Sequence, residues 1–212
     1  MKKAEASHWL GNNLTGGRKK FGAAEIATID QLIIKAHRLT KFPMCIHHDD
    51  AMGYYDRIIR SHAILNIRKF GIPNNICKVY IIAHNLMEFR TQINNSISKK
   101  SYSSTKKLQC HGAGQGTGNR GTKWTFISIP MIEVVEEVSK GYIIQLPKGS
   151  NTWETHMLAF VDDKRHYVNG NNKQTRKSIL TTLEISVSSW NELLHFVCGT
   201  LEISKCAWYL IK

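Results

Sequence analysis

The sequence predicts an α+β fold, in which a small, mainly antiparallel sheet is backed by helices packed on one face. Several long segments carry apolar residues at helical spacing. Short apolar runs between them end in acidic residues, as strands that lead into turns often do. Hydrophobic residues make up 42% of the 212-residue chain, which is typical of a protein with a packed core. With no internal repeat, we expect one domain over residues 1–212.

The predicted helices share apolar residues spaced three and four apart, as in Ile26, Ile29 and Ile33. Asp56 is the expected N-cap of the second helix, and Gly71 is its expected end. The predicted helices cover residues 23–40, 57–70, 75–87, 130–140 and 179–197.

The predicted strands are short. Residues 44–46 form an apolar run that leads into His47-His48-Asp49-Asp50. Residues 157–168 read as strand, tight turn and strand, with Asp162 and Asp163 at the tip. A hairpin is expected over 89–103, with its turn near 94–96. A final strand or hairpin is expected over 201–211.

Charge and cysteine usage limit the partners and the compartment. The net charge of +13 and the pI near 9.6 favour polyanionic partners, with nucleic acid first and anionic membranes second. The five cysteines are scattered, which argues against a disulfide framework or a structural zinc site. The amino terminus lacks the apolar core of a signal peptide, and no apolar run is long enough to span a membrane. We therefore expect a soluble, intracellular protein without membrane partners.

Three acids are expected at strand ends: Asp50, Asp162 and Asp163. Carboxylates from different strands that converge can hold two divalent ions about 3.5–4 Å apart for phosphoryl transfer. The alternative is a plain hairpin, because Asp is a common turn residue. His47 and His48 flank these acids, but hard magnesium prefers oxygen, so we expect no catalytic task for them.

A glycine-rich segment, residues 111–121, holds five glycines in eleven residues. Glycine lets the backbone approach a nucleotide closely. The spacing of Gly116, Gly118 and Gly121 matches a dinucleotide fingerprint. That interpretation, a nucleotide-binding oxidoreductase, requires a βαβ unit that the sequence does not predict around the segment. The Walker pattern fails at Thr122-Lys123.

Taken in order, these motifs make the chain resemble the palm of a reverse transcriptase. The first palm motif of that family, a strand-borne Asp followed by an aromatic residue, matches Asp50 and Tyr55. The second, Gly-x-x-Gln-Gly, matches residues 112–116, and the third, aromatic-x-Asp-Asp, matches residues 160–163. Residues 16–18 resemble the fingers segment that leads into the palm, and residues 201–205 resemble the fourth palm motif. The amino-acid sequence of several stretches is most similar to retroelement-derived reverse transcriptase-like proteins of protists and fungi.

The resemblance implies an RNA-directed DNA polymerase, a nucleotidyltransferase that uses two Mg²⁺ ions, with Mn²⁺ as a substitute. It implies that Asp50 and Asp162 bind metal with Asp163 as companion acid. Lys205 would act on the departing pyrophosphate. The residues implied to contact the nucleotide or template are Tyr55, Gln115, Gly116 and Arg18.

The resemblance also implies partners and boundaries. The partners would be an RNA or DNA template with its primer, and deoxynucleoside triphosphates. Residues 1–42 would be partial fingers and residues 43–212 the palm, with no thumb. A retrotransposon fragment or remnant is therefore expected. The alternative is a non-catalytic nucleic-acid-binding remnant that keeps the fold and the basic surface.

Overall fold

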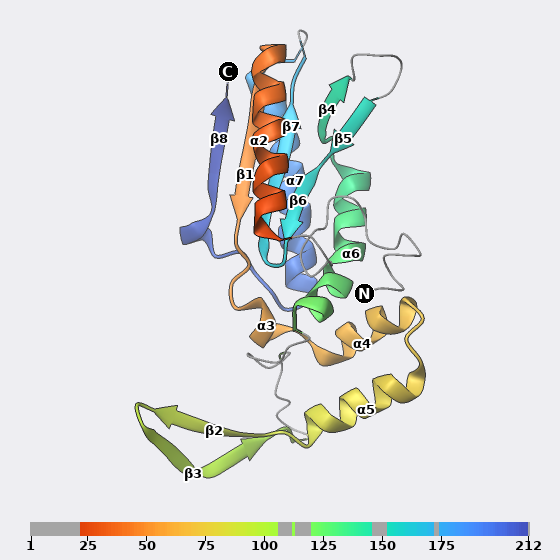
Figure 1. Cartoon of the computed structure of the whole chain (residues 1–212), viewed down its shortest axis with the longest axis vertical. Coiled ribbons are helices and arrows are strands. Elements are labelled where there is room, and N and C mark those ends of the chain that lie inside the picture. The colour runs from red at the N-terminus through yellow and green to blue at the C-terminus, as the bar shows by residue number, and fades with distance from the viewer. Residues whose placement is uncertain (1–21, 106–111, 113–119, 146–151, 172–173, 212) are drawn as a thin grey trace.

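The computed structural model describes residues 22–105, 112, 120–145, 152–171 and 174–211 (Figure 1). Its helices are α2 (Ala23–Thr40), α3 (Tyr54–Arg57), α4 (Arg60–Lys69), α5 (Asn74–Asn85), α6 (Arg120–Val138), α7 (Arg176–Phe196) and the 3₁₀ turn η1 (Ile203–Lys205). Its strands are β1 (Met44–Asp49), β2 (Glu88–Ile93), β3 (Ser96–Ser103), β4 (Tyr142–Gln145), β5 (Thr152–Thr155), β6 (Met157–Phe160), β7 (Asp163–Asn169) and β8 (Ala207–Ile211).

The central sheet has the strand order β6-β7-β1-β8, and each neighbouring pair is antiparallel. Strand β1 therefore lies between β7 and β8, although more than a hundred residues separate it from either. Its register aligns Asp49 with Lys164. The predicted α+β class with a small antiparallel sheet is confirmed. Within the described residues there is no parallel strand pair, so the βαβ unit that an oxidoreductase would need is not present there.

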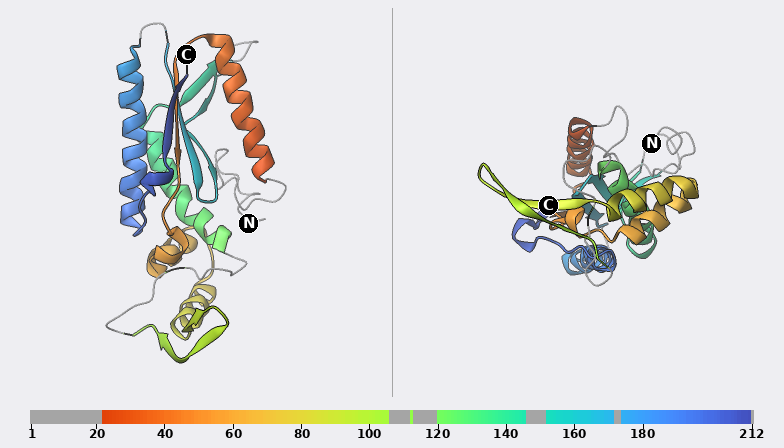
Figure 2. Two further views of the ribbon diagram at one scale, coloured as in Figure 1. Left: turned by 90° about the vertical axis from the view of Figure 1, so that its left-hand side faces the viewer. Right: turned by 90° about the horizontal axis from the view of Figure 1, so that it is seen from below.

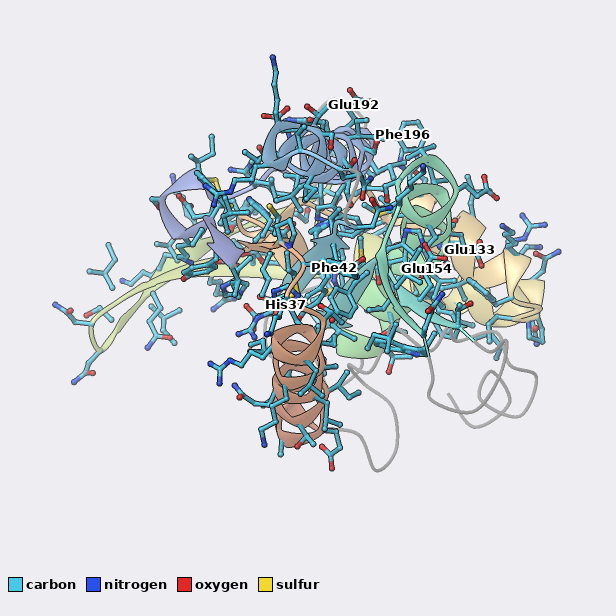
Figure 3. All side chains as sticks on the ribbon, turned by 90° about the horizontal axis from the view of Figure 1, so that it is seen from above. His37, Phe42, Glu133, Glu154, Glu192 and Phe196 are labelled. Carbon is cyan, nitrogen blue, oxygen red and sulfur yellow. The ribbon has the colours of Figure 1, made fainter. Side chains whose placement is uncertain are left out.

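Helices cover both faces of this sheet (Figure 2). Helix α2 lies on one face, and α7 lies on the other with α6 beside it. Seen along the long axis, His37 of α2 and Glu192 of α7 lie on opposite sides of the sheet (Figure 3). The expectation that the helices back a single face is therefore wrong. The physical reason is that β1 and β7 carry buried side chains on both faces, so each face needs a cover.

The alternation of side chains along β1 and β7 divides the core. Met44 and Tyr167 point toward α2 and pack with Ile33. Cys45 and Val168 point the other way and pack with α7. A third cluster joins α7 to α4 and α6 around Trp124 and Trp190, both almost fully buried.

A buried acid ties α2 to the sheet. The Asp30 carboxylate accepts a hydrogen bond from the Tyr167 hydroxyl at 2.7 Å and forms an ion pair with Arg165. Asp30 is only 5% exposed, so both partners are needed to offset its desolvation. Burial, followed by this carboxylate, raises the pKa of Tyr167.

Most predicted elements occur, with shifted ends. The helix over 23–40 has the predicted bounds, and the hairpin turn falls at 94–95 as expected. The helix predicted over 57–70 begins at Arg60, after the separate short helix α3. Asp56 lies inside α3, so its predicted N-cap role is wrong; Ile59 is the N-cap of α4.

Helix α6 is the largest correction. It begins at Arg120, ten residues before the predicted start, and Pro130 lies inside it. Proline removes one backbone hydrogen bond, yet α6 continues because Ile127, Met131 and Val135 are buried against its neighbours. The β4–β5 pair was not predicted. The end of the chain forms η1 and a single strand, β8.

Helix α5 and the β2–β3 hairpin extend away from the sheet (Figure 1). Only Cys77 and His84 of α5 are buried. Among the described helices, none is long and apolar enough to span a bilayer.

Gly141, between α6 and β4, offers a stability test. A Cβ at this position would lie 2.5 Å from the backbone oxygen of Thr155. Gly141→Ala should therefore destabilise the chain by about 1–3 kcal/mol, because backbone must move. Gly121→Ala is the matched control, since nothing lies within 4 Å of its Cβ, and it should stabilise α6 by up to about 1 kcal/mol. Urea unfolding measures both, and equal midpoints would contradict the packing described here.

Candidate active site

The turn between β6 and β7 presents two acids. Phe160 pairs with Asp163, so only Val161 and Asp162 form the turn. Val161 has φ of +57°, a left-handed conformation that costs a β-branched residue about 1–3 kcal/mol. Its carbonyl oxygen accepts hydrogen bonds from Trp124 Nε1 at 2.6 Å and from Lys164 Nζ at 3.2 Å. Two donors thus hold a strained turn in place.

Lys164 is a buried cation directly beneath this turn. Its Nζ lies 4.4 Å from the centre of the Trp190 ring and 4.9 Å from that of Trp124, and it also donates to the Asp162 carbonyl at 3.4 Å. Burial lowers the pKa of Lys164 to about 8, while the neighbouring acids, Asp49 first, act in the opposite direction. The ammonium therefore braces the backbone that carries Asp162. Sequence reasoning missed it, because a lysine on a short basic segment normally faces solvent.

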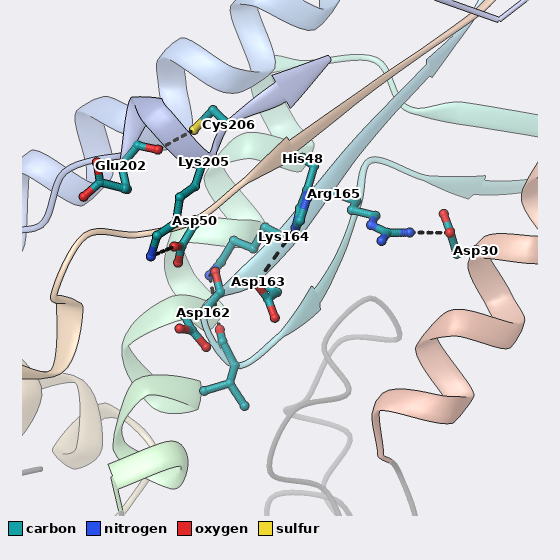
Figure 4. Close-up of polar contacts among 11 residues, drawn as sticks. Asp30, His48, Asp50, Asp162, Asp163, Lys164, Arg165, Glu202, Lys205 and Cys206 are labelled. Carbon is teal, nitrogen blue, oxygen red and sulfur yellow. Dashed lines mark hydrogen bonds and ion pairs between the residues drawn. The ribbon is translucent and has the colours of Figure 1, made fainter. Parts of the chain in front are cut away.

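Asp50 follows the last residue of β1 and meets Lys205. Lys205 Nζ donates to Asp50 Oδ2 at 2.7 Å (Figure 4). The segment before η1 is pinned there by its backbone: Met52 N–H donates to the Thr200 carbonyl, and Glu202 N–H to the Asp50 carbonyl, each at 2.8 Å. The hydrogen bond to the Asp50 carboxylate raises the pKa of Lys205. Residues 155 positions apart are thus brought into contact.

The acids share one electrostatic environment. The pKa of Asp162 is raised by burial first, then by the negative charges of Asp163 and Asp50. Asp163 is more exposed, and its Oδ1 lies 3.9 Å from His48 Nε2 (Figure 4). The structure therefore brings together Asp50, Asp162, Asp163 and Lys205, which the sequence singled out, at one end of the sheet.

The donor set suits a hard divalent cation in its chemistry, because all three acids offer carboxylate oxygen. The pKa of Asp162 is raised by burial first and then by the charges of Asp163 and Asp50, and a bound cation would oppose both effects. In the arrangement described, however, the Lys205 ammonium occupies Asp50, and no three His, Cys, Asp or Glu side chains of the described residues form a group that could hold a metal. Metal binding at these acids would require Lys205 to move away from Asp50.

A second polar cluster lies immediately behind the first and is buried. His166 Nε2 is 3.0 Å from Asp49 Oδ2, and His166 Nδ1 is 2.7 Å from Ser186 Oγ. This is the residue set of a hydrolase triad, but each of the three is at most 1% exposed, so no substrate can reach the serine. The cluster instead joins β1, β7 and α7. The motif match selected Asp50, and no sequence signal indicated that the neighbouring Asp49 is buried.

The predicted nucleotide-contacting residues lie wholly or partly outside the described part of the chain. Tyr55 lies in α3, directly after the Asp50 segment, and its side chain lies outside the described part. Arg18, Gln115 and Gly116 also lie outside the described residues. Gly112, which opens the glycine motif, has φ of +95°, and its N–H donates to the Ile58 carbonyl at 2.9 Å. The first residue of the motif therefore contacts the link between α3 and α4. This link follows Asp50 and α3 in the sequence.

The positive charge of the chain is concentrated in one segment. Residues 57–132 contain twelve lysines and arginines and a single acid, Glu88. This segment includes α4, α5 and the β2–β3 hairpin, which lie beyond the acid-bearing end of the sheet (Figure 1). It also includes most of α6, which packs against that end through Trp124. A strongly basic segment next to clustered acids suits a polyphosphate ligand, because the basic side chains attract phosphates and the acids can bind a cation that the phosphates share.

Comparison with known proteins identifies the fold. No protein-family model matches the chain, and a search of curated proteins finds no match. Among solved structures, apo telomerase from Candida tropicalis, truncated from its C-terminal domain, superposes with a TM-score of 0.63 at 14% identity, covering 100% of this chain and 38% of that one. Telomerase from Candida tropicalis in complex with a TWJ fragment of telomeric RNA gives 0.61 at 14% identity, covering 99% and 32%.

A third structure, telomerase from Candida albicans in complex with a TWJ fragment of telomeric RNA, gives a TM-score of 0.53 at 11% identity, covering 100% of this chain and 32% of that one. The chain therefore spans 32–38% of the length of these proteins. At such identities the likeness shows the fold alone. The chain therefore shares its fold with part of these telomerase structures.

Proposed function

We propose that the chain is the palm of an RNA-directed DNA polymerase and transfers a nucleotide from a deoxynucleoside triphosphate to a primer 3′-hydroxyl. One observation carries the proposal. Asp50, Asp162, Asp163 and Lys205 come from three distant segments and converge at one end of an antiparallel sheet, in a reverse-transcriptase-like fold. A structural role alone would not favour gathering three carboxylates whose charges repel one another.

The roles follow from position and charge. Asp50 and Asp162 would hold two magnesium ions, with Asp163 as companion acid; bound magnesium would activate the 3′-hydroxyl and neutralise charge on the leaving group. Lys205 carries an ammonium that would leave Asp50 when metal binds there, and it would then supply a proton to the departing pyrophosphate. Trp124 and Lys164 position Asp162 through the turn carbonyls.

The other contacts remain proposals from the family resemblance. Tyr55 would lie beneath the incoming sugar and exclude a 2′-hydroxyl. Gln115 and Gly116 would line the nucleotide pocket, and Arg18 would contact template or triphosphate. The basic segment 57–132 would follow the phosphates of a template–primer duplex. Residues 1–42 would be the lead-in from the fingers and 43–212 the palm, within a retroelement polymerase or its remnant.

A non-catalytic nucleic-acid-binding remnant is the second candidate. The observation that favours it is the ion pair of Lys205 with Asp50, which occupies a proposed metal ligand. In this alternative the basic segment still binds nucleic acid, while the acids bind no metal.

Primer extension tests the choice. A DNA primer on an RNA template, with Mg²⁺ or Mn²⁺ and deoxynucleoside triphosphates, should be extended by the wild-type chain. Binding of the same duplex is measured in parallel by fluorescence anisotropy. Absence of extension with either ion, while the duplex still binds, would replace the polymerase with the non-catalytic alternative.

Binding should depend steeply on salt, because phosphate contacts dominate. For roughly six contacts with a duplex, affinity should fall about 1,000-fold between 50 and 200 mM salt. Changing Lys99 and Lys100 of the exposed hairpin to Gln should reduce the slope of log affinity against log salt by about 1–2. The matched control changes Arg176 and Lys177, outside the basic segment, and should leave the slope unchanged. An affinity that stays flat over this range would contradict phosphate binding.

A further inference from the structure

An apolar pocket lies between α4, α5 and α6, apart from the candidate active site. Its volume is about 190 Å³, and none of its lining residues belongs to the acid cluster. The walls are mostly apolar: Ile64, Ile67, Ile72, Ile76, Cys77 and Phe126, with Tyr80, Thr122 and Lys123 completing them.

Lys123 places a buried cation at the wall of this pocket. The residue is only 5% exposed. Its Nζ lies 4.2 Å from the centre of the Tyr80 ring and 3.4 Å from His84 Nε2. Burial, followed by the charge of Arg60, lowers the pKa of Lys123 to about 8. Burial, followed by the charges of Lys123 and then Arg60, lowers the pKa of His84 to about 4. His84 is therefore neutral near pH 7 and accepts a hydrogen bond from the ammonium, but it brings no negative charge.

No acid balances this cation among the described residues, where Arg60 adds a second positive charge beside it. Arg60 donates to the carbonyls of His84 and Gly112, which are neutral acceptors. Across residues 57–132 the sole acid is Glu88, at the exposed start of β2. Buried charges in proteins are normally paired, so a lysine at an apolar pocket without a carboxylate lacks its usual partner.

We propose that this pocket binds a small amphiphilic carboxylate, whose apolar body fills the space between α4, α5 and α6 and whose carboxylate pairs with Lys123 Nζ. The size fits, because an apolar cavity of about 150 Å³ accommodates benzene. A nucleotide is too large and too polar for these walls. The ligand supplies the negative charge that the sequence does not.

Hexanoate is a suitable probe, and 1-hexanol is its neutral match. Isothermal titration of the whole chain should show hexanoate binding at least about tenfold more tightly than hexanol, because a charge-assisted hydrogen bond is gained. Lys123→Met keeps the apolar volume and removes the charge, so it should abolish this preference while hexanol still binds. Lys140→Met, at an exposed lysine after α6, should keep the preference.

A second measurement needs no variant. Hexanoate should protect Lys123 of the wild-type chain from reductive methylation, as located by mass spectrometry, whereas equal concentrations of hexanol or sodium chloride should not. Equal affinity for hexanoate and hexanol, no binding of hexanoate, or an unprotected Lys123 would overturn the proposal. Protection of Lys123 by a short oligonucleotide that displaces hexanoate would also overturn it, since the lysine would then serve a phosphate.

Discussion

Asp162→Asn is expected to lower the rate of primer extension by about 100- to 1,000-fold or more, because the amide cannot replace a carboxylate that binds magnesium and stabilises transition-state charge. Binding of the template–primer duplex should change little, since the basic segment is untouched. Single-nucleotide extension under saturating duplex measures the first effect, and fluorescence anisotropy the second.

The same variant should be more stable than the wild type. Burial, Asp163 and Asp50 raise the pKa of Asp162 in the folded chain. A carboxyl group with a raised folded-state pKa contributes most stability when protonated, below its unfolded pKa, and loses it as pH rises. At neutral pH the ionised group therefore opposes folding, and a neutral Asn removes that cost. Loss of activity with a gain in unfolding midpoint is the signature of a residue retained for function.

Glu137→Gln, an exposed acid of α6, is the matched control and should change neither quantity. Extension by Asp162→Asn at the wild-type rate would remove the acid from the mechanism. A lower unfolding midpoint for this variant would instead give Asp162 a structural role and contradict the electrostatic account above.

Asp49→Ala is expected to have the opposite profile, with a loss of about 3–5 kcal/mol in the free energy of unfolding. Asp49 is fully buried, and its removal leaves His166 without its partner on β1. The strands β1 and β7 and the helix α7 meet at this cluster, so the loss should be global. Urea unfolding followed by circular dichroism measures it.

Asp163→Ala is the control for this second prediction. Its side chain is 63% exposed, and its contact with His48 is long, so stability should change by less than about 0.5 kcal/mol. If Asp49→Ala costs less than about 1 kcal/mol, the buried cluster does not hold the three elements together. Asp49 would then have no larger structural role than the exposed Asp163, although Asp49 is buried.

The sequence alone determined the class of fold, most elements and the set of acids. Periodicity located α2, α5 and α7 because each has an apolar stripe that must be buried. Acids directly after apolar runs predicted Asp50, Asp162 and Asp163 as residues of one site, since a strand end delivers its side chains to an edge of the sheet. The tertiary structure places these acids close enough for their charges to interact.

Tertiary structure alone decided what surrounds those acids. Because proline usually begins or breaks a helix, Pro130 led to a predicted start ten residues too late. Packing against the core keeps α6 helical on both sides of this proline. The two-sided cover of the sheet depends on which helix returns to which face. Lys164, His166 and Asp49 are residue types that usually lie at the surface. They are buried because β1 pairs with β7 and because α6 and α7 cover that face of the sheet. The ion pair of Lys205 with Asp50 likewise arises from a contact between distant segments, which no local pattern encodes.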